Sequence, residues 1–230
     1  MLAVGLAATL LSACVQVVVG SGDVRTEELS VAPFTELELV GSATVIVERG
    51  ERQRVEVEAQ PNILDILETR TSGDRLILGE TTGVGYTPSE PVTFRVSVPR
   101  LEEVEVSGSG EVSLADVRAD RMVVRVSGSG TISLSGAVDD LRVAIDGSGS
   151  VTASGSAKEL RVDVSGSGAF EGVELSVEDA DVRVSGSGSA AVKASGRLEA
   201  DVSGSGSIAY VGEPAELETS IEGSGSIRRR

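Results

Sequence analysis

The sequence predicts an all-β fold, a parallel β-solenoid, and three observations carry this prediction. Between residues 108 and 225 the tripeptide Gly-Ser-Gly recurs at intervals of 18 to 20 residues, which is typical of stacked repeats and not of a flexible linker. Apolar and polar residues alternate on both sides of each tripeptide, as they do in strands. Aromatic residues make up 2% of the 230 residues and Trp is absent, so the core must consist of aliphatic side chains.

The first residues, MLAVGLAATLLSACVQ, contain an apolar run that is too short to span a bilayer and that ends in small residues before Cys14, the one cysteine. The segment resembles the lipobox of bacterial lipoproteins, although no Lys or Arg precedes the apolar run. The resemblance implies that residues 1–13 are a signal peptide, that the thiol of Cys14 is diacylated, and that this lipid holds the protein on a membrane. Because Val15 and not Asp follows the cysteine, it also implies sorting to the outer membrane.

Residues 14–30 are predicted to be a tether, and residues 31–100 a β-rich N-terminal part of the same domain as the repeats. The stretch FTELELVGSATVIVERGERQRVEVEAQ alternates apolar and polar residues. A Gly-containing turn at residues 49–50 divides it, so it predicts successive strands.

A short helical turn is predicted next, because Ile63, Leu64 and Leu67 in NILDILETRT have helical spacing. SGDRLILGE then returns to a strand after a Gly-Asp turn. The Gly and Pro content of TTGVGYTPSEP indicates a loop before the repeats begin.

The repeats occupy residues 101–227 as β-solenoid rungs of about 19 residues, and a basic tail of residues 228–230 follows. Equivalent apolar residues form core columns along the axis, and rungs are expected to be roughly 4.8 Å apart. The glycines either pack tightly inside a bend or adopt the positive φ of a corner, and the sequence leaves both open. The column two residues before each first glycine is Val106, Val126, Ile145, Val164, Val184, Val202 and Ile221.

The serine inside each tripeptide is the same in every rung and predicts a stripe of hydroxyl groups along the solenoid. This stripe is a candidate surface for a glycan or a protein partner. A structural role is the alternative, because small polar residues suit a crowded bend and can form hydrogen bonds along the column. The stripe consists of Ser109, Ser129, Ser148, Ser167, Ser187, Ser205 and Ser224.

Charge and composition exclude several classes of function. A net charge of −16 and a pI near 4.4 oppose nucleic-acid binding. The chain has no His, so Ser-His-Asp and Cys-His catalysis and His-ligated zinc are excluded. The acidic clusters at residues 139–140 and 178–181 are candidates for polysaccharide chemistry, but each adjoins a turn where charge normally solvates the surface.

One charged column lies between two core columns, with opposite charges on adjacent rungs. Ion pairs between rungs are the favoured interpretation over calcium binding by Asp163 and Asp201, because the Gly-Gly-x-Gly-x-Asp repeats of calcium-binding solenoids are absent. The column reads Glu105, Arg125, Ala144, Asp163, Arg183, Asp201 and Ser220.

The region from about Phe34 to Tyr210 resembles the auto-transporter adhesin head domain family, also called head GIN. The resemblance is carried by three blocks in order: FTELELVGSATVIVERG, NILDILETRTSGDRLIL and the iterated VSGSG. It implies a right-handed parallel β-helix in the periplasm or on the cell surface, with no established enzymatic activity.

The sequence therefore predicts a non-catalytic, lipid-anchored protein of the cell envelope that acts by contact as an adhesin-like binding module, without a cofactor or metal. The alternative is an envelope scaffold that associates end to end with its own copies. A polysaccharide-active β-helix enzyme is a third interpretation. The three differ in whether we expect a bound ligand, self-association or turnover.

Overall fold

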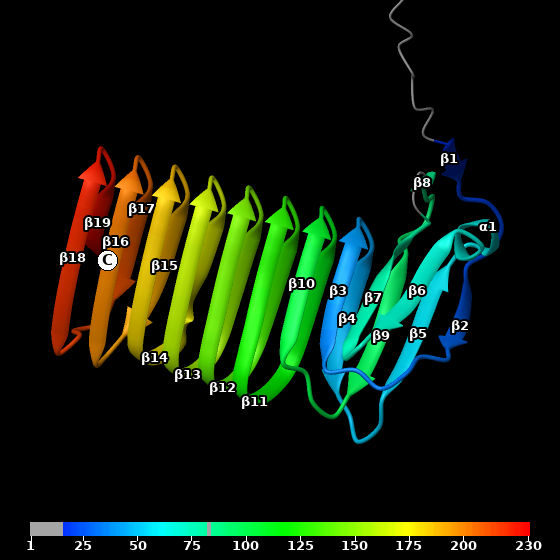
Figure 1. Cartoon of the computed structure of the whole chain (residues 1–230), viewed down its shortest axis with the longest axis horizontal. Coiled ribbons are helices and arrows are strands. Elements are labelled where there is room, and N and C mark those ends of the chain that lie inside the picture. The colour runs from blue at the N-terminus through cyan, green and yellow to red at the C-terminus, as the bar shows by residue number, and fades with distance from the viewer. Residues whose placement is uncertain (1–15, 82–83) are drawn as a thin grey trace, which may run out of the picture.

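The computed structural model of the protein describes residues 16–81 and 84–230, so Cys14 and the predicted signal peptide lie outside the described residues. From Glu103 to Arg229 the chain forms a β-solenoid whose strands stack in parallel (Figure 1). The prediction of an all-β solenoid is confirmed. Its strands are β10 (Glu103–Gly108), β11 (Glu111–Gly128), β12 (Thr131–Gly147), β13 (Ser150–Gly166), β14 (Ala169–Gly186), β15 (Ser189–Ala194), β16 (Arg197–Gly204), β17 (Ser207–Val211), β18 (Glu216–Gly223) and β19 (Ser226–Arg229).

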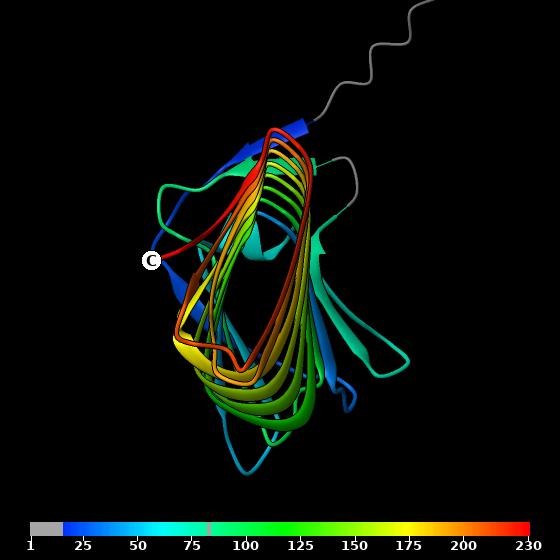
Figure 2. The ribbon, with the colours of Figure 1, turned by 90° about the vertical axis from the view of Figure 1, so that its left-hand side faces the viewer.

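The stacking is in register, as the repeats predict. Val104 pairs with Val124, and the column continues through Val143, Val162 and Val182 on successive rungs. These side chains are buried because alternation directs every second residue inward. Viewed along the axis, each rung is a flattened loop with a tight bend at the Gly-Ser-Gly tripeptide and a wider bend opposite (Figure 2).

The two tripeptide glycines have different roles, so both possibilities left open by the sequence occur. Gly166 has φ +111°, and a Cβ there would lie 2.6 Å from the carbonyl oxygen of Gly147 on the preceding rung. Gly168 has no positive φ and is buried, and its Cβ would lie 2.5 Å from the side chain of Ile145. The first glycine therefore makes the corner, and the second allows close packing behind it.

The N-terminal region adds one further rung to the solenoid and, beyond it, strands that cover this end. β3 (Glu36–Gly41) and β4 (Thr44–Arg49) pair in parallel with β10 and β11, and so form a rung of their own. Antiparallel pairs finish this end of the sheet. The remaining strands are β2 (Arg25–Leu29), β5 (Arg54–Ala59), β6 (Leu67–Ser72), β7 (Arg75–Glu80) and β9 (Thr93–Val98).

Helix α1 (Pro61–Leu64) lies where the sequence predicts a helical turn, but it ends before Leu67. Leu67 instead begins β6, because LETRTS alternates half-buried and exposed side chains and pairs with β7 through the predicted Gly-Asp turn. The helical spacing of Leu67 was therefore misleading. Pro61 at the first helical position fits its fixed φ.

Two segments differ from the sequence prediction. Strands β1 (Gln16–Val19) and β2 lie within residues 14–30, which were predicted to be a tether, and β8 (Val84–Thr87) lies within the predicted loop. β1 pairs with β8, and β2 pairs with β5. Most of β2 is exposed, so it lacks the alternation that reveals a half-buried strand.

Candidate binding surfaces

The predicted serine stripe forms one continuous column on the tight bend. All seven serines are exposed. The N–H group of Ser167 donates to the carbonyl oxygen of Gly147 at 2.8 Å, and the other six serines are held in the same way by the preceding rung. Their backbone donors are thus satisfied, and the hydroxyl groups face solvent.

Hydrogen bonds along the serine column itself would support a purely structural role. A hydroxyl pair of this kind exists in a neighbouring column, where the hydroxyl oxygens of Thr131 and Ser150 lie 3.2 Å apart. Within residues 16–81 and 84–230, the seven stripe hydroxyls have no such side-chain partner. They remain available to a ligand.

The column has an earlier member that the Gly-Ser-Gly repeat does not reveal. Gly41 pairs with Gly108 and also has a positive φ, so Ser42 occupies the position equivalent to Ser109. Tyr86 and Glu80 lie beside it, and burial raises the pKa of both side chains. The signal was present in ELELVGSATV, which aligns with EVEVSGSGEV.

Ion pairs between rungs cover the face formed by β3, β10, the second halves of β11 to β14, and β16. Arg183 lies 3.6 Å from Asp201, which confirms the predicted pairing in that part of the charged column. At the other end Arg75 contacts four glutamates across β3 and β10, including Glu103 at 2.6 Å. The sequence did not indicate Arg75, because β7 joins this face only through tertiary pairing.

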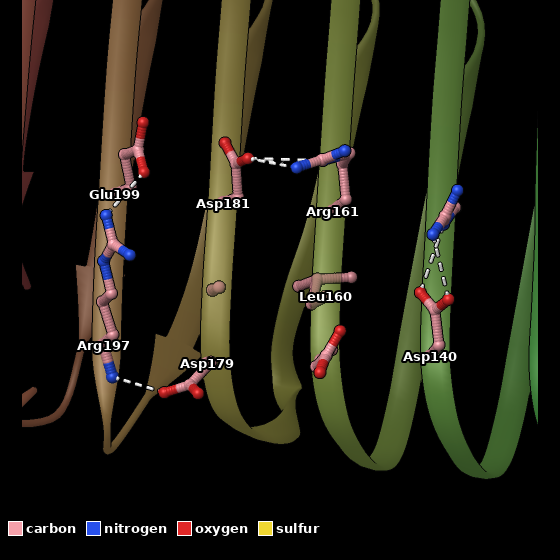
Figure 3. A pocket seen from close by; sticks show the side chains of 10 residues that line it. Asp140, Leu160, Arg161, Asp179, Asp181, Arg197 and Glu199 are labelled. Atoms are coloured by element: carbon pink, nitrogen blue, oxygen red, sulfur yellow. Dashed lines mark hydrogen bonds and ion pairs between the residues drawn. The ribbon is translucent and has the colours of Figure 1, made fainter.

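The same face contains a shallow groove of about 280 Å³ (Figure 3). It crosses four rungs, with Leu160 and Ala180 between charged side chains. Arg161 donates to Asp181 at 2.9 Å, and Arg197 donates to Glu199 at 2.9 Å. The groove is therefore lined by carboxylate–guanidinium pairs.

The acidic clusters considered for catalysis lie at or beside this groove, and four of their five carboxylates are paired with donors. Asp139 accepts from Lys158 at 2.8 Å, and Asp179 accepts from the N–H group of Arg197 at 2.8 Å. Asp140 is held by Arg121 and Arg142. A glycosidase needs one carboxyl with a raised pKa as its general acid, and the pKa of Asp140 moves the other way.

Metal binding and membrane spanning by a helix find no support within the described residues. No group of three or more Asp, Glu, Cys or His side chains is placed to hold a metal ion in residues 16–81 and 84–230. In this same part of the chain no helix has both the length and the apolar character that a bilayer span requires.

The charge network predicts a pH-dependent contribution to stability at Asp140. Burial tends to raise the pKa of Asp140, but hydrogen bonds from Arg142 and Arg121 outweigh it and hold the pKa below its usual range. The contribution is therefore present above the unfolded pKa and is lost as pH falls through the folded pKa. We expect Asp140→Asn to lower the free energy of unfolding by about 1 kcal/mol at neutral pH, and by much less near pH 3.

Urea denaturation at both pH values measures this effect, with the exposed Asp65 changed to Asn as a matched control. A destabilisation by Asp140→Asn that stayed equal at the two pH values would show that packing, and not charge, carries the contribution.

These features define a class of protein: a β-solenoid that presents long columns of repeated side chains and shallow charged grooves. The chain belongs to the family described as "Putative auto-transporter adhesin, head GIN domain", whose profile matches residues 33–214. A comparison with curated proteins gave no match.

Solved structures share the fold, among them the following three. A "putative adhesin" from Bacteroides fragilis has a TM-score of 0.88 at 20% identity, over 93% of this chain and 100% of its own. A "putative lipid binding protein" from Parabacteroides distasonis has a TM-score of 0.79 at 25% identity, over 94% and 100% of the two chains. A "putative adhesin" from the same species has a TM-score of 0.75 at 24% identity, over 94% and 100%.

Proposed function

We propose that the protein is a non-catalytic, lipid-anchored component of the bacterial cell envelope that acts by contact. The lipid on Cys14 holds it on the outer membrane, and the serine stripe binds a surface glycan or a protein. The observation that carries the proposal is the in-register column of exposed hydroxyl groups on a rigid edge. Membership of a family described as adhesins supports it.

The electrostatics narrow the range of partners. The net charge of −16 opposes nucleic acid, and the stripe itself is uncharged. A ligand that offers both hydrogen-bond donors and acceptors, such as a glycan, fits a row of hydroxyls, since each hydroxyl can act in either sense.

One observation favours a second candidate, a scaffold that self-associates end to end. On β18, Leu217 and Ile221 continue the core columns but are each 48% exposed. Exposed apolar residues beside a strand edge favour pairing with another strand. This candidate predicts dimers or longer assemblies and no soluble ligand.

We expect bulky residues in the stripe to remove binding without unfolding the protein. In the full chain carrying Cys14→Ser, the double change Ser148→Tyr and Ser167→Tyr should lower affinity for purified envelope polysaccharides or intact bacteria by about tenfold or more, because two or more hydrogen bonds are lost. The midpoint of thermal unfolding should change little, since both serines are exposed.

A matched control uses Ser156 and Ser176, which are also exposed and lie on adjacent rungs at the opposite bend. Changing both to Tyr should leave binding intact. Equal loss from the two double variants, or saturable binding unaffected by the stripe variant, would refute the stripe as the site. Light scattering on the same samples measures their molecular mass and so tests whether the protein forms the dimers or longer assemblies that the scaffold alternative predicts.

A further inference from the structure

Strand β1 is fixed to the body of the protein very close to Cys14. Its four residues pair with β8, from Gln16 with Val84 to Val19 with Thr87. The side-chain amide of Asn62 donates to the carbonyl oxygen of Val19 at 2.8 Å. The next residue is held too, because the N–H group of Gly20 donates to the carbonyl oxygen of Thr87 at 3.0 Å.

Only Val15 separates Cys14 from β1 in the sequence. An extended chain covers about 3.3–3.6 Å per residue, so the Cα atom of Cys14 lies within roughly 7 Å of that of Gln16. This reach is far shorter than that of a tether of residues 14–30. A lipid on Cys14 would therefore bring β1 itself to the membrane surface.

The exposed side of β1 is apolar. Val17 is 57% exposed and Val19 is 68% exposed, whereas Val18 between them packs against the core. Alternation places Val17 and Val19 on the same side of the strand. They are two of the five large apolar side chains that the described residues leave exposed.

Strands β1 and β8 themselves carry no formal charge, in contrast to the rest of this acidic chain, and burial raises the pKa of Glu80, the acid beside Tyr86. The stretches QVVVGSG at residues 16–22 and VGYTPS at residues 84–89 contain no ionisable acid or base other than Tyr86. A protein of net charge −16 is repelled by anionic lipid over most of its surface. The two strands of the β1–β8 sheet are an uncharged patch that can approach such a surface with less repulsion than the rest of the protein.

We propose that β1 docks on the bilayer, with Val17 and Val19 in its interfacial layer, so that the protein is held against the membrane without a flexible tether. This inference rests on the proposed lipidation of Cys14. It names the lipid bilayer as the partner of this face and gives the rod one fixed point of contact at its N-terminal end.

Lipid-borne quenching of a fluorophore tests the proposal in the full, lipidated chain on vesicles of phosphatidylethanolamine and phosphatidylglycerol. Acylation blocks Cys14, so Val19→Cys provides a single thiol for a bimane label. The matched control is Leu217→Cys, an exposed apolar position on β18 at the far end of the solenoid (Figure 1). We expect nitroxide lipids to quench the label at residue 19 roughly twofold or more over that at residue 217.

Flotation of the unlabelled chain and of Cys14→Ser separates the two proposals. If the unlabelled chain does not float with vesicles, the proposed anchoring fails. If it floats while the labels at residues 19 and 217 are quenched equally, the anchor stands and the docking of β1 is overturned. A second label through Val17→Cys, on the same side of the strand, must agree with that at residue 19.

Discussion

Replacing Gly166 with Ala is expected to lower the free energy of unfolding by about 2–6 kcal/mol, because two effects add. An L-residue at φ +111° costs about 1–3 kcal/mol in backbone strain. The new Cβ would also lie 2.6 Å from the carbonyl oxygen of Gly147, and forcing an extra carbon into a packed site costs about 1–3 kcal/mol more. Urea denaturation of the purified chain measures the change.

Gly73→Ala is the matched control, because Gly73 also has a positive φ, of +61°, but a Cβ added there would meet no atom within 4 Å. It isolates the cost of backbone strain from the cost of the clash. We expect a loss of about 1 kcal/mol at Gly73. If both variants lost equally little stability, the tripeptide glycines would not be needed to bring neighbouring rungs together.

Replacing Phe170 with Ala is expected to destabilise the fold by about 3–5 kcal/mol. Phe170 is 1% exposed and is one of the two largest fully buried side chains of the described residues. It stacks between Val151 and Ala190, and a Cβ on Gly172 would lie 2.6 Å from its ring. Because Ala190 and Gly172 are small, they cannot fill the cavity that the ring leaves.

The conservative change Phe170→Leu serves as the reference and should cost about 1–2 kcal/mol, since Leu refills most of the volume. Thermal and urea unfolding of the two variants give the comparison. If the Ala variant were as stable as the Leu variant, the neighbouring rungs would have to move in and fill the cavity. The stacked core would then be more deformable than its regular register indicates.

The solenoid could be predicted because its information is local and repeated. A two-residue alternation and a period near 19 residues place Val104, Val124 and Val143 in one column, and the structure puts them there. The rung formed by β3 and β4 carries the same pattern only once, with Ala43 in place of the second glycine, so it was not recognised as a rung.

The strands that were missed depend on partners far away in the sequence. β1 is defined by pairing with β8, and β2 by pairing with β5. β1 packs only Val18 against the core and β2 only Leu29, so neither shows the repeated alternation that indicates a half-buried strand. Arg75 was missed for the same reason, since its four glutamate partners lie on two other strands.

The part of the candidate site that belongs to the repeat could be predicted from the sequence. The exposed serine column follows from position alone, because each serine sits one residue after a corner glycine. The groove could not be predicted from the sequence, because it depends on which carboxylate each guanidinium group pairs with. Arg125 of the charged column pairs with Glu103 and not with Glu105, although both glutamates lie on the adjacent rung.

Rungs of 18, 19 and 20 residues all stack on one another in register at the tight bend. The extra residues are absorbed elsewhere, at irregularities such as that between Leu114 and Val117. The height of the rod is thus set by the number of rungs, at about 4.8 Å each, and not by the number of amino acids. Duplication of a single repeat in the gene would therefore lengthen the solenoid by one rung, whatever the number of residues in that repeat.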